Sequence, residues 1–149
     1  MAVRPIPEGY HTVTTYFVVS DNRKFLGFIE RAFGATITYK SQEIDGVIHH
    51  AEAKIGDSMI MSGQAMEPTH PPMPCAVYLY VEDTDAWYNR AVAAGGKSTG
   101  EPETKFYGDR NAGVEDEWGN KWWLGTHVED VAPEELKRRE TEFLAKQPK

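Results

Sequence analysis

The chain has 149 residues, a net charge of −7 at pH 7 and a single cysteine. This length suits one domain of ordinary size or two small modules fused in series, and the negative charge, spread along the chain, argues against nucleic acid as a partner. Cys75 cannot form an intrachain disulfide, the N-terminal residues lack the apolar segment of a signal peptide, and no apolar run of about 18 residues is present to span a membrane. We therefore expect a cytoplasmic protein that binds neither nucleic acid nor membranes.

The first half of the chain predicts a strand, a helix and three further strands. Residues 12–19 are β-branched and aromatic, Asp21 stands at the N-cap position of an amphipathic helix, and Gly34 follows where a left-handed residue would end that helix. The later strands are expected over residues 35–43, 48–55 and 58–62, with turns at Asp45-Gly46 and Gly56-Asp57.

The same order recurs in the second half, although less regularly after the helix. The helix there would be capped by Thr84 and stopped by Gly95. We expect strands over residues 75–81, 113–116 and 121–125, and a loop over residues 106–110. Gly34 and Gly95 are 61 positions apart, and Asp21 and Asp83 are 62 apart, which indicates an internal repeat with a register near 62 residues.

Four prolines within residues 64–74 exclude a central strand or helix between the two repeats. Pro133 begins a last predicted helix, over residues 133–146, with a sparse apolar stripe formed by Leu136, Phe143 and Leu144. We interpret residues 1–149 as a single domain with four parts: a first module over about 10–63, a linker over 64–74, a second module over about 75–127, and the C-terminal helix.

Several phrases of the chain resemble the vicinal oxygen chelate superfamily, and most of all the PhnB-like branch of the glyoxalase/bleomycin-resistance proteins. These phrases are YFVVSDNRKFLGFIERAFGA at residues 16–35, FYGDR at 106–110 and VEDEWGNKWWLGTHVEDV at 114–131. The resemblance covers residues 5–131 and implies an α+β fold, in which two βαβββ modules pair curved mixed sheets into a cup. Metal-binding members of that superfamily place ligands on the first and fourth strands of each module, and the matching positions here are Thr14, Met61, Ala76 and Trp123. None of these is a usual ligand of a divalent ion, so we expect neither a metal at that position nor another cofactor.

Alternation along the strands would turn a set of mainly aromatic side chains into the cup. The candidate ligand-binding residues are Thr14, Tyr16, Met61, Tyr78, Tyr80 and Trp123, and Arg110 in the predicted loop could pair with an anionic ligand. The alternative interpretation is that the rings fill the cup as a solid core and that Arg110 only pairs with Asp109 within its loop.

His50 and Glu52 are the candidate catalytic residues. The short turn at Gly56-Asp57 places Glu52 opposite Met61, and His50 lies two positions away on the same face of the strand, so the pair could act as general acid and base. The alternative is a polar face exposed to solvent, on which Lys54 neutralises Glu52.

These patterns favour a metal-independent protein that binds a small, partly aromatic organic molecule, and they leave open whether it is an enzyme. One alternative is a lyase or isomerase that uses His50 and Glu52 or a relocated metal site. Another is a module whose aromatic surface serves protein association. We expect a homodimer, because relatives of this type often pair and the C-terminal helix needs an apolar surface to cover.

Overall fold

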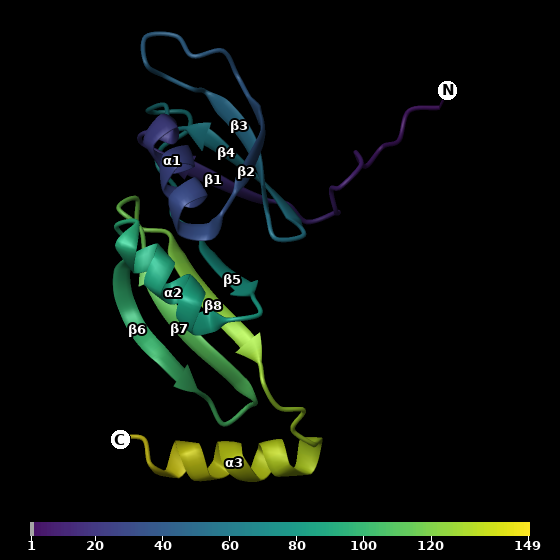
Figure 1. Cartoon of the computed structure of the whole chain (residues 1–149), viewed down its shortest axis with the longest axis vertical. Coiled ribbons are helices and arrows are strands. Elements are labelled where there is room, and N and C mark those ends of the chain that lie inside the picture. Colours follow the sequence, from purple (N-terminus) through teal and green to yellow (C-terminus); the bar gives the residue numbers. More distant parts are fainter. Residues whose placement is uncertain (1) are drawn as a thin grey trace.

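Two modules of the same architecture follow one another along the chain, as Figure 1 shows, and the computed structural model describes residues 2–149. The first module consists of β1 (Thr15–Val19), α1 (Asn22–Phe33), β2 (Thr36–Lys40), β3 (His50–Ile55) and β4 (Ser58–Gln64). The second consists of β5 (Ala76–Tyr80), α2 (Thr84–Ala93), β6 (Lys97–Thr104), β7 (Asp109–Glu115) and β8 (Lys121–His127). The chain then forms α3 (Pro133–Ala145).

Each module forms an open, four-stranded mixed sheet. The strand orders are β1-β4-β3-β2 and β5-β8-β7-β6, and the first strand of each module pairs in parallel with its fourth. Tyr16 pairs with Met61 in the first sheet, and Tyr78 pairs with Trp123 in the second, 62 positions further along. The structure thus confirms the predicted α+β fold of two βαβββ modules with a C-terminal helix.

The helix-facing sides of the two sheets meet in one continuous core. Phe17 of β1 stacks on Trp122 of β8 with ring centroids 4.9 Å apart, and Phe33 of α1 lies 4.5 Å from the same indole ring. Trp122 is 1% exposed, and its ring N–H donates to the buried carboxylate of Asp116. Because α1 and α2 lie next to each other on this side (Figure 1), the opposite faces of both sheets are left free of helices.

The starts of the two helices use the same chemistry. Asp21 accepts a hydrogen bond from the backbone N–H of Lys24 at 3.0 Å, and Asp83 accepts one from Ala86 at 3.0 Å. The prediction of Thr84 as the second cap was therefore wrong by one residue. Thr84 is instead the first residue of α2. Asp83 already accepts the hydrogen bond from the backbone N–H in the first turn of the helix, so the Thr84 hydroxyl donates elsewhere, to the carbonyl of Arg110 at 2.9 Å.

Strand β6 is absent from the sequence-based expectation, which treated these residues as irregular. It lies at the edge of its sheet and pairs only with β7, and its register shifts on either side of Gly100. An edge position tolerates the missing N–H of Pro102, and the shifts disrupt the period-two pattern by which strands are recognised. Strand β7 also begins earlier than predicted, at Asp109, inside the expected loop.

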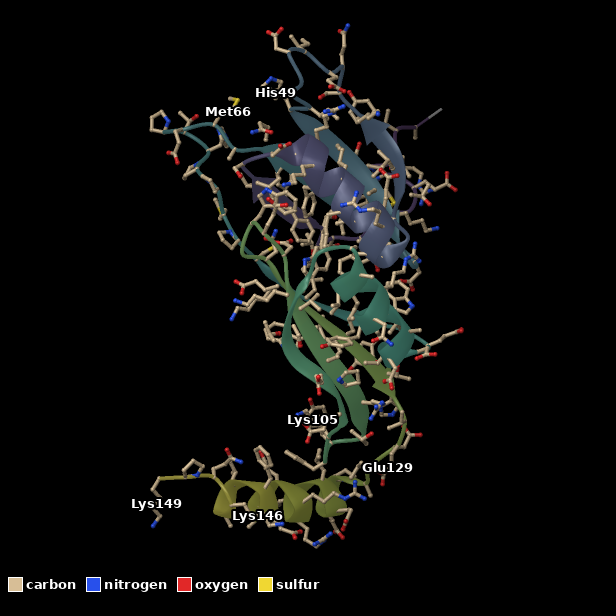
Figure 2. The ribbon with its side chains drawn as sticks, turned by 60° about the vertical axis from the view of Figure 1, so that its left-hand side comes forward. His49, Met66, Lys105, Glu129, Lys146 and Lys149 are labelled. Carbon is tan, nitrogen blue, oxygen red and sulfur yellow. The ribbon has the colours of Figure 1, made fainter. Side chains whose placement is uncertain are left out.

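The C-terminal helix lies at the end of the molecule away from the first module. Figure 2 shows this arrangement, with Lys105 and Glu129 labelled near the junction and His49 and Met66 at the opposite end. Helix α3 has no buried residue, and its contacts include an ion pair between Arg139 and Glu129 and a tilted ring contact between Phe143 and Phe106. Among residues 2–149, no helix combines the length and the apolar composition needed to cross a bilayer.

Candidate functional site

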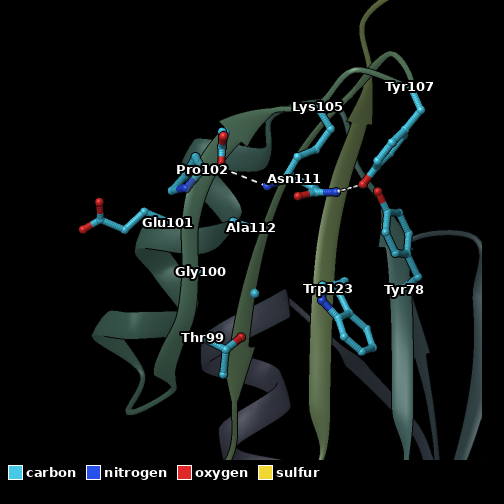
Figure 3. Close-up of a pocket in the computed structure, with 12 residues that line it drawn as sticks. Tyr78, Thr99, Gly100, Glu101, Pro102, Lys105, Tyr107, Asn111, Ala112 and Trp123 are labelled. Carbon is cyan, nitrogen blue, oxygen red and sulfur yellow. Dashed lines mark hydrogen bonds and ion pairs between the residues drawn. The ribbon is translucent and has the colours of Figure 1, made fainter. Parts of the chain in front are cut away.

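The helix-free face of the second sheet carries an aromatic cavity of about 790 Å³. Tyr78 of β5 and Trp123 of β8 stand side by side in its wall (Figure 3), and they are 39% and 40% exposed. The opposite wall comes from β6, where Thr99 lies, and Tyr107 of the loop after β6 stands next to Tyr78. Large rings that remain this exposed on a concave surface can stack on a planar molecule.

A tyrosine lies across a glycine on the helix-free face of each sheet. A Cβ atom added to Gly125 would collide with the ring and hydroxyl of Tyr78, and one added to Gly63 would meet the Tyr16 hydroxyl at 2.6 Å. Both tyrosines belong to the first strand of their module, and both glycines to the fourth. The repeat therefore produces two equivalent aromatic surfaces.

The tyrosines of the second module are oriented by a buried carboxylate. The hydroxyls of Tyr78 and Tyr80 each donate to Asp109 at 3.1 Å, and the Nδ1 of His127 lies 2.9 Å from the same side chain. Burial alone would raise the pKa of Asp109, but the bonds from His127, Tyr80 and Tyr78 outweigh it and hold that pKa below its ordinary value. Burial and the neighbouring carboxylate raise the pKa of Tyr78 to about 12, so this phenol remains a hydrogen-bond donor.

The first module has its own pocket, of about 630 Å³, on its helix-free face. Thr14, Met61 and Glu52 line it, and the segment before β1 covers it through Pro7 and Tyr10. The hydroxyl of Tyr10 donates to Glu52, and burial, together with this carboxylate, raises the pKa of Tyr10 to about 12. Glu52 lies opposite Met61, as the turn geometry predicted.

His50 and Glu52 share a face of β3, yet they bond to different tyrosines. The Nδ1 of His50 lies 3.2 Å from the hydroxyl of Tyr16, and the two rings stack at 5.8 Å, whereas Glu52 bonds to Tyr10. Within residues 2–149, no hydrogen bond or ion pair joins His50 to Glu52 or Lys54 to Glu52. Lys54 therefore does not neutralise Glu52, and His50 and Glu52 remain two separate polar groups on one face of β3.

Arg110 lies away from the helix-free face. Its guanidinium forms two hydrogen bonds to Asp85 of α2, at 2.7 and 3.0 Å, and a third to Thr104. Its position in β7 turns it toward the helix, because Asp109 and Asn111, its neighbours on either side, face the other way. Arg110 therefore does not lie where we expected it to pair with an anionic ligand in the cup.

Sequence reasoning missed several residues of these pockets. Tyr10 lies before the first predicted strand, and Thr99 belongs to the unrecognised β6. Asn111, whose amide donates to the hydroxyl of Tyr107, fell in the predicted irregular region. The period-two spacing of Asp109, Asn111 and Gly113 was the available signal for an extended strand with one face toward the pocket.

A comparison with protein families decides the family of the chain. The model of the Glyoxalase/Bleomycin resistance protein/Dioxygenase superfamily matches residues 10–124, which span most of both modules. The chain belongs to this superfamily. An uncharacterized protein of Mycobacterium bovis, Mb0911c, is 30% identical over 134 residues, and the match covers 83% of this chain and 88% of that protein. The uncharacterized protein Rv0887c of Mycobacterium tuberculosis is likewise 30% identical, with 79% of its length covered.

Several solved structures share the fold of this chain. TioX from Micromonospora sp. ML1 has a TM-score of 0.69 at 24% identity, over 79% of this chain and 99% of that one. A PhnB protein from Bacillus cereus, described as a putative 3-demethylubiquinone-9 3-methyltransferase, has a TM-score of 0.62 at 16% identity, over 78% and 99%. At these identities the likeness shows the fold alone.

The metal that some members of the Glyoxalase/Bleomycin resistance protein/Dioxygenase superfamily bind does not fit the residues present here. The matching positions hold a hydroxyl, a thioether, a methyl group and an indole, from Thr14, Met61, Ala76 and Trp123. In the described part of the chain, no three His, Cys, Asp or Glu side chains gather in a way that could hold an ion. Glu52 is the one carboxylate in the wall of the pocket that Thr14 and Met61 line.

Proposed function

We propose that this protein binds a small, partly aromatic organic molecule without a metal, and that the helix-free aromatic faces of its sheets form the binding surface. The observation that carries the proposal is the pair formed by Tyr78 and Trp123, which are adjacent, more than a third exposed, and part of the wall of a cavity of about 790 Å³. Pockets of this size and composition are typical of sites for small molecules.

The energetics of these side chains support binding over simple core filling. Each large ring has apolar area still in contact with water, and covering it with a planar ligand is favourable by about 25 cal/mol per Å². The tyrosine hydroxyls are already satisfied by Asp109, so a ligand that covers Tyr78 need not break its hydrogen bond. The surface is thus held in place before a ligand arrives.

We further propose that a second copy of the chain completes the site. Tyr16 and Met61 lie on the first sheet, with Thr14 just before its first strand, and Tyr78, Tyr80 and Trp123 lie on the second sheet. Thr14 and Met61 line the first-module pocket, whereas Tyr78 and Trp123 line the second-module cavity. A two-fold axis could place the first module of one protomer against the second module of its partner. Such a homodimer would close two equivalent cups from residues that one chain keeps apart.

Fluorescence titration tests the binding function. Planar aromatic compounds should quench tryptophan emission saturably, and Trp123→Ala should weaken that binding by about 1–3 kcal/mol, the scale of a lost aromatic contact. The affinity should not change when a chelator is present. Trp118→Phe serves as the control, because Trp118 packs on Phe25 and Phe28 in the core rather than lining the aromatic cavity.

Two results would contradict the proposal. If no compound of a broad aromatic panel binds and Trp123→Ala strongly lowers stability, the rings are core and the protein is better described as an association module. If bound compounds are converted to products, and Glu52→Gln or His50→Gln stops the conversion, the lyase or isomerase alternative replaces simple binding.

A further inference from the structure

Glu52 places a carboxylate in the first-module pocket without a cationic partner. Its Oε1 accepts a hydrogen bond from the hydroxyl of Tyr10, and no described residue donates to Oε2. Among residues 2–149, no ion pair joins it to a lysine, arginine or histidine. The side chain is half-buried, so water screens its charge less than at an open surface.

Apolar side chains form two sides of the pocket around this carboxylate, and Tyr10, His11, Thr12 and Thr14 add polar groups to its lining. Pro5, Ile6 and Pro7 of the N-terminal segment form one side of the pocket, and Met61 of β4 forms another. Tyr10 ties that segment to β3 through its bond to Glu52, and Gly9 adopts a positive φ of 84° next to Met59. The N-terminal segment is therefore held against the sheet and forms one wall of the pocket.

A carboxylate in such surroundings has a definite chemical preference. It can only accept hydrogen bonds, and the bonds it accepts from cationic N–H groups are about twice as strong as neutral ones. The phenol of Tyr10 stays protonated, since burial and Glu52 raise its pKa to about 12, so it supplies one donor and no positive charge. The free lone pairs of Glu52 are thus left for an N–H group that enters from outside, and the chain's net charge of −7 attracts cations to it.

We infer that the ligand of this protein carries a positively charged amine or guanidinium group that pairs with Glu52, while its aromatic part covers the aromatic faces. This inference rests on the proposed binding function and narrows it to cationic aromatic molecules. Glu52 would then select for charge, while the rings supply most of the contact area.

Three naphthalene compounds of nearly equal size provide the test: naphthylmethylamine, naphthylmethanol and naphthoate. Their affinities are measured by isothermal titration calorimetry on the full chain at about pH 8, above the usual range of histidine titration and below that of the amine. In the wild type, the amine should bind roughly tenfold more tightly than the alcohol, and naphthoate most weakly.

Three variants, each of which removes one negative charge, show which carboxylate causes the preference for the amine. Glu52→Gln keeps an oxygen that can accept the Tyr10 hydrogen bond, so the fold should persist, and it should reduce the preference for the amine to within about twofold while binding of the alcohol is retained. Glu101→Gln removes the same charge from the wall of the second-module cavity, and Glu134→Gln removes it from α3. Glu134, which lines neither pocket, is the control, and Glu134→Gln should keep the preference of the wild type. Glu101→Gln tests the alternative that the cationic group pairs with a carboxylate in the second-module cavity.

The outcomes distinguish the proposed aromatic binding from the recognition of a cationic group by Glu52. If all three compounds bind equally, or if Glu52→Gln keeps the preference, aromatic binding stands and the cationic assignment is wrong. Loss of the preference in Glu101→Gln instead would place the cationic group in the second module and likewise overturn the role of Glu52. If none of the compounds binds, the proposed function fails together with this inference.

Discussion

At the scale of single residues, the aromatic face of the second module depends on Asp109. This carboxylate, 5% exposed, accepts hydrogen bonds from Tyr78 and Tyr80 and contacts His127, whose other ring nitrogen lies 2.7 Å from Asp130. An imidazole can donate from both nitrogens only when it is protonated. The full network therefore requires the charged form of His127.

The stability of the protein should accordingly depend on the protonation of His127. Hydrogen bonds to Asp109 and then to Asp130 raise its pKa above the ordinary value in the folded state. A group of this kind contributes fully below its unfolded pKa, about 6.5, and loses its contribution as the pH rises through the higher folded value. We expect the melting temperature to fall over that window, and His127→Gln to remove this part of the fall in thermal scans across pH. His70→Gln, in the exposed linker, is the control, and identical pH profiles for all three proteins would contradict the prediction.

At the scale of elements, the repeat places a matched cap at the start of each helix. Asp21 and Asp83 both accept a backbone N–H from three residues further on, at 3.0 Å. The helices they start cover one face of the sheets and leave the other free. The caps thus fix where each of these helices begins.

Removing either cap should have a similar cost. Asp21→Ala and Asp83→Ala should each lower the free energy of unfolding by about 1 kcal/mol, measured by urea denaturation, because each leaves a helix N–H without its acceptor. Asp57→Ala is the matched control, since Asp57 is exposed in a turn and bonds only to the hydroxyl of Ser58. A loss in Asp57→Ala as large as in the two cap variants would show that the caps are not the cause.

At the scale of the whole molecule, the two modules share one core but carry their aromatic faces separately. Stacked rings such as Phe17 and Trp122 join the modules on the helix side. The other faces remain open, and α3, with Leu144 60% exposed, covers neither of them. Open concave faces and an exposed apolar stripe on α3 are both surfaces that a second chain can cover.

We therefore expect the protein to be a dimer at micromolar concentration. Analytical ultracentrifugation should give a mass of about twice the 16.8 kDa of one chain. Added aromatic ligand should favour the dimer further, because a site built from both chains binds only the associated form. A species of 16.8 kDa, unchanged by ligand, would contradict both the dimer and the shared site.

The sequence by itself determined the features that depend on local spacing. The caps at Asp21 and Gly34, the buried face of β3, the pairing of Glu52 with Met61 and the 62-residue repeat all follow from short periods and turn chemistry, and the structure contains them. These features could be predicted because each involves residues within a few positions of one another, or two copies of the same pattern.

Only the tertiary structure decided which of these features meet. The bond from Tyr10 to Glu52 joins residues 42 positions apart. Arg110 lies in β7, where a loop was predicted, and pairs with Asp85 on a separate helix. The division of the aromatic residues between the helix-free faces of two separate sheets follows from how the modules pack through their ring core. Contacts of this kind depend on the orientation of whole elements, which is fixed by the summed packing of distant side chains and leaves no periodic signal in the chain.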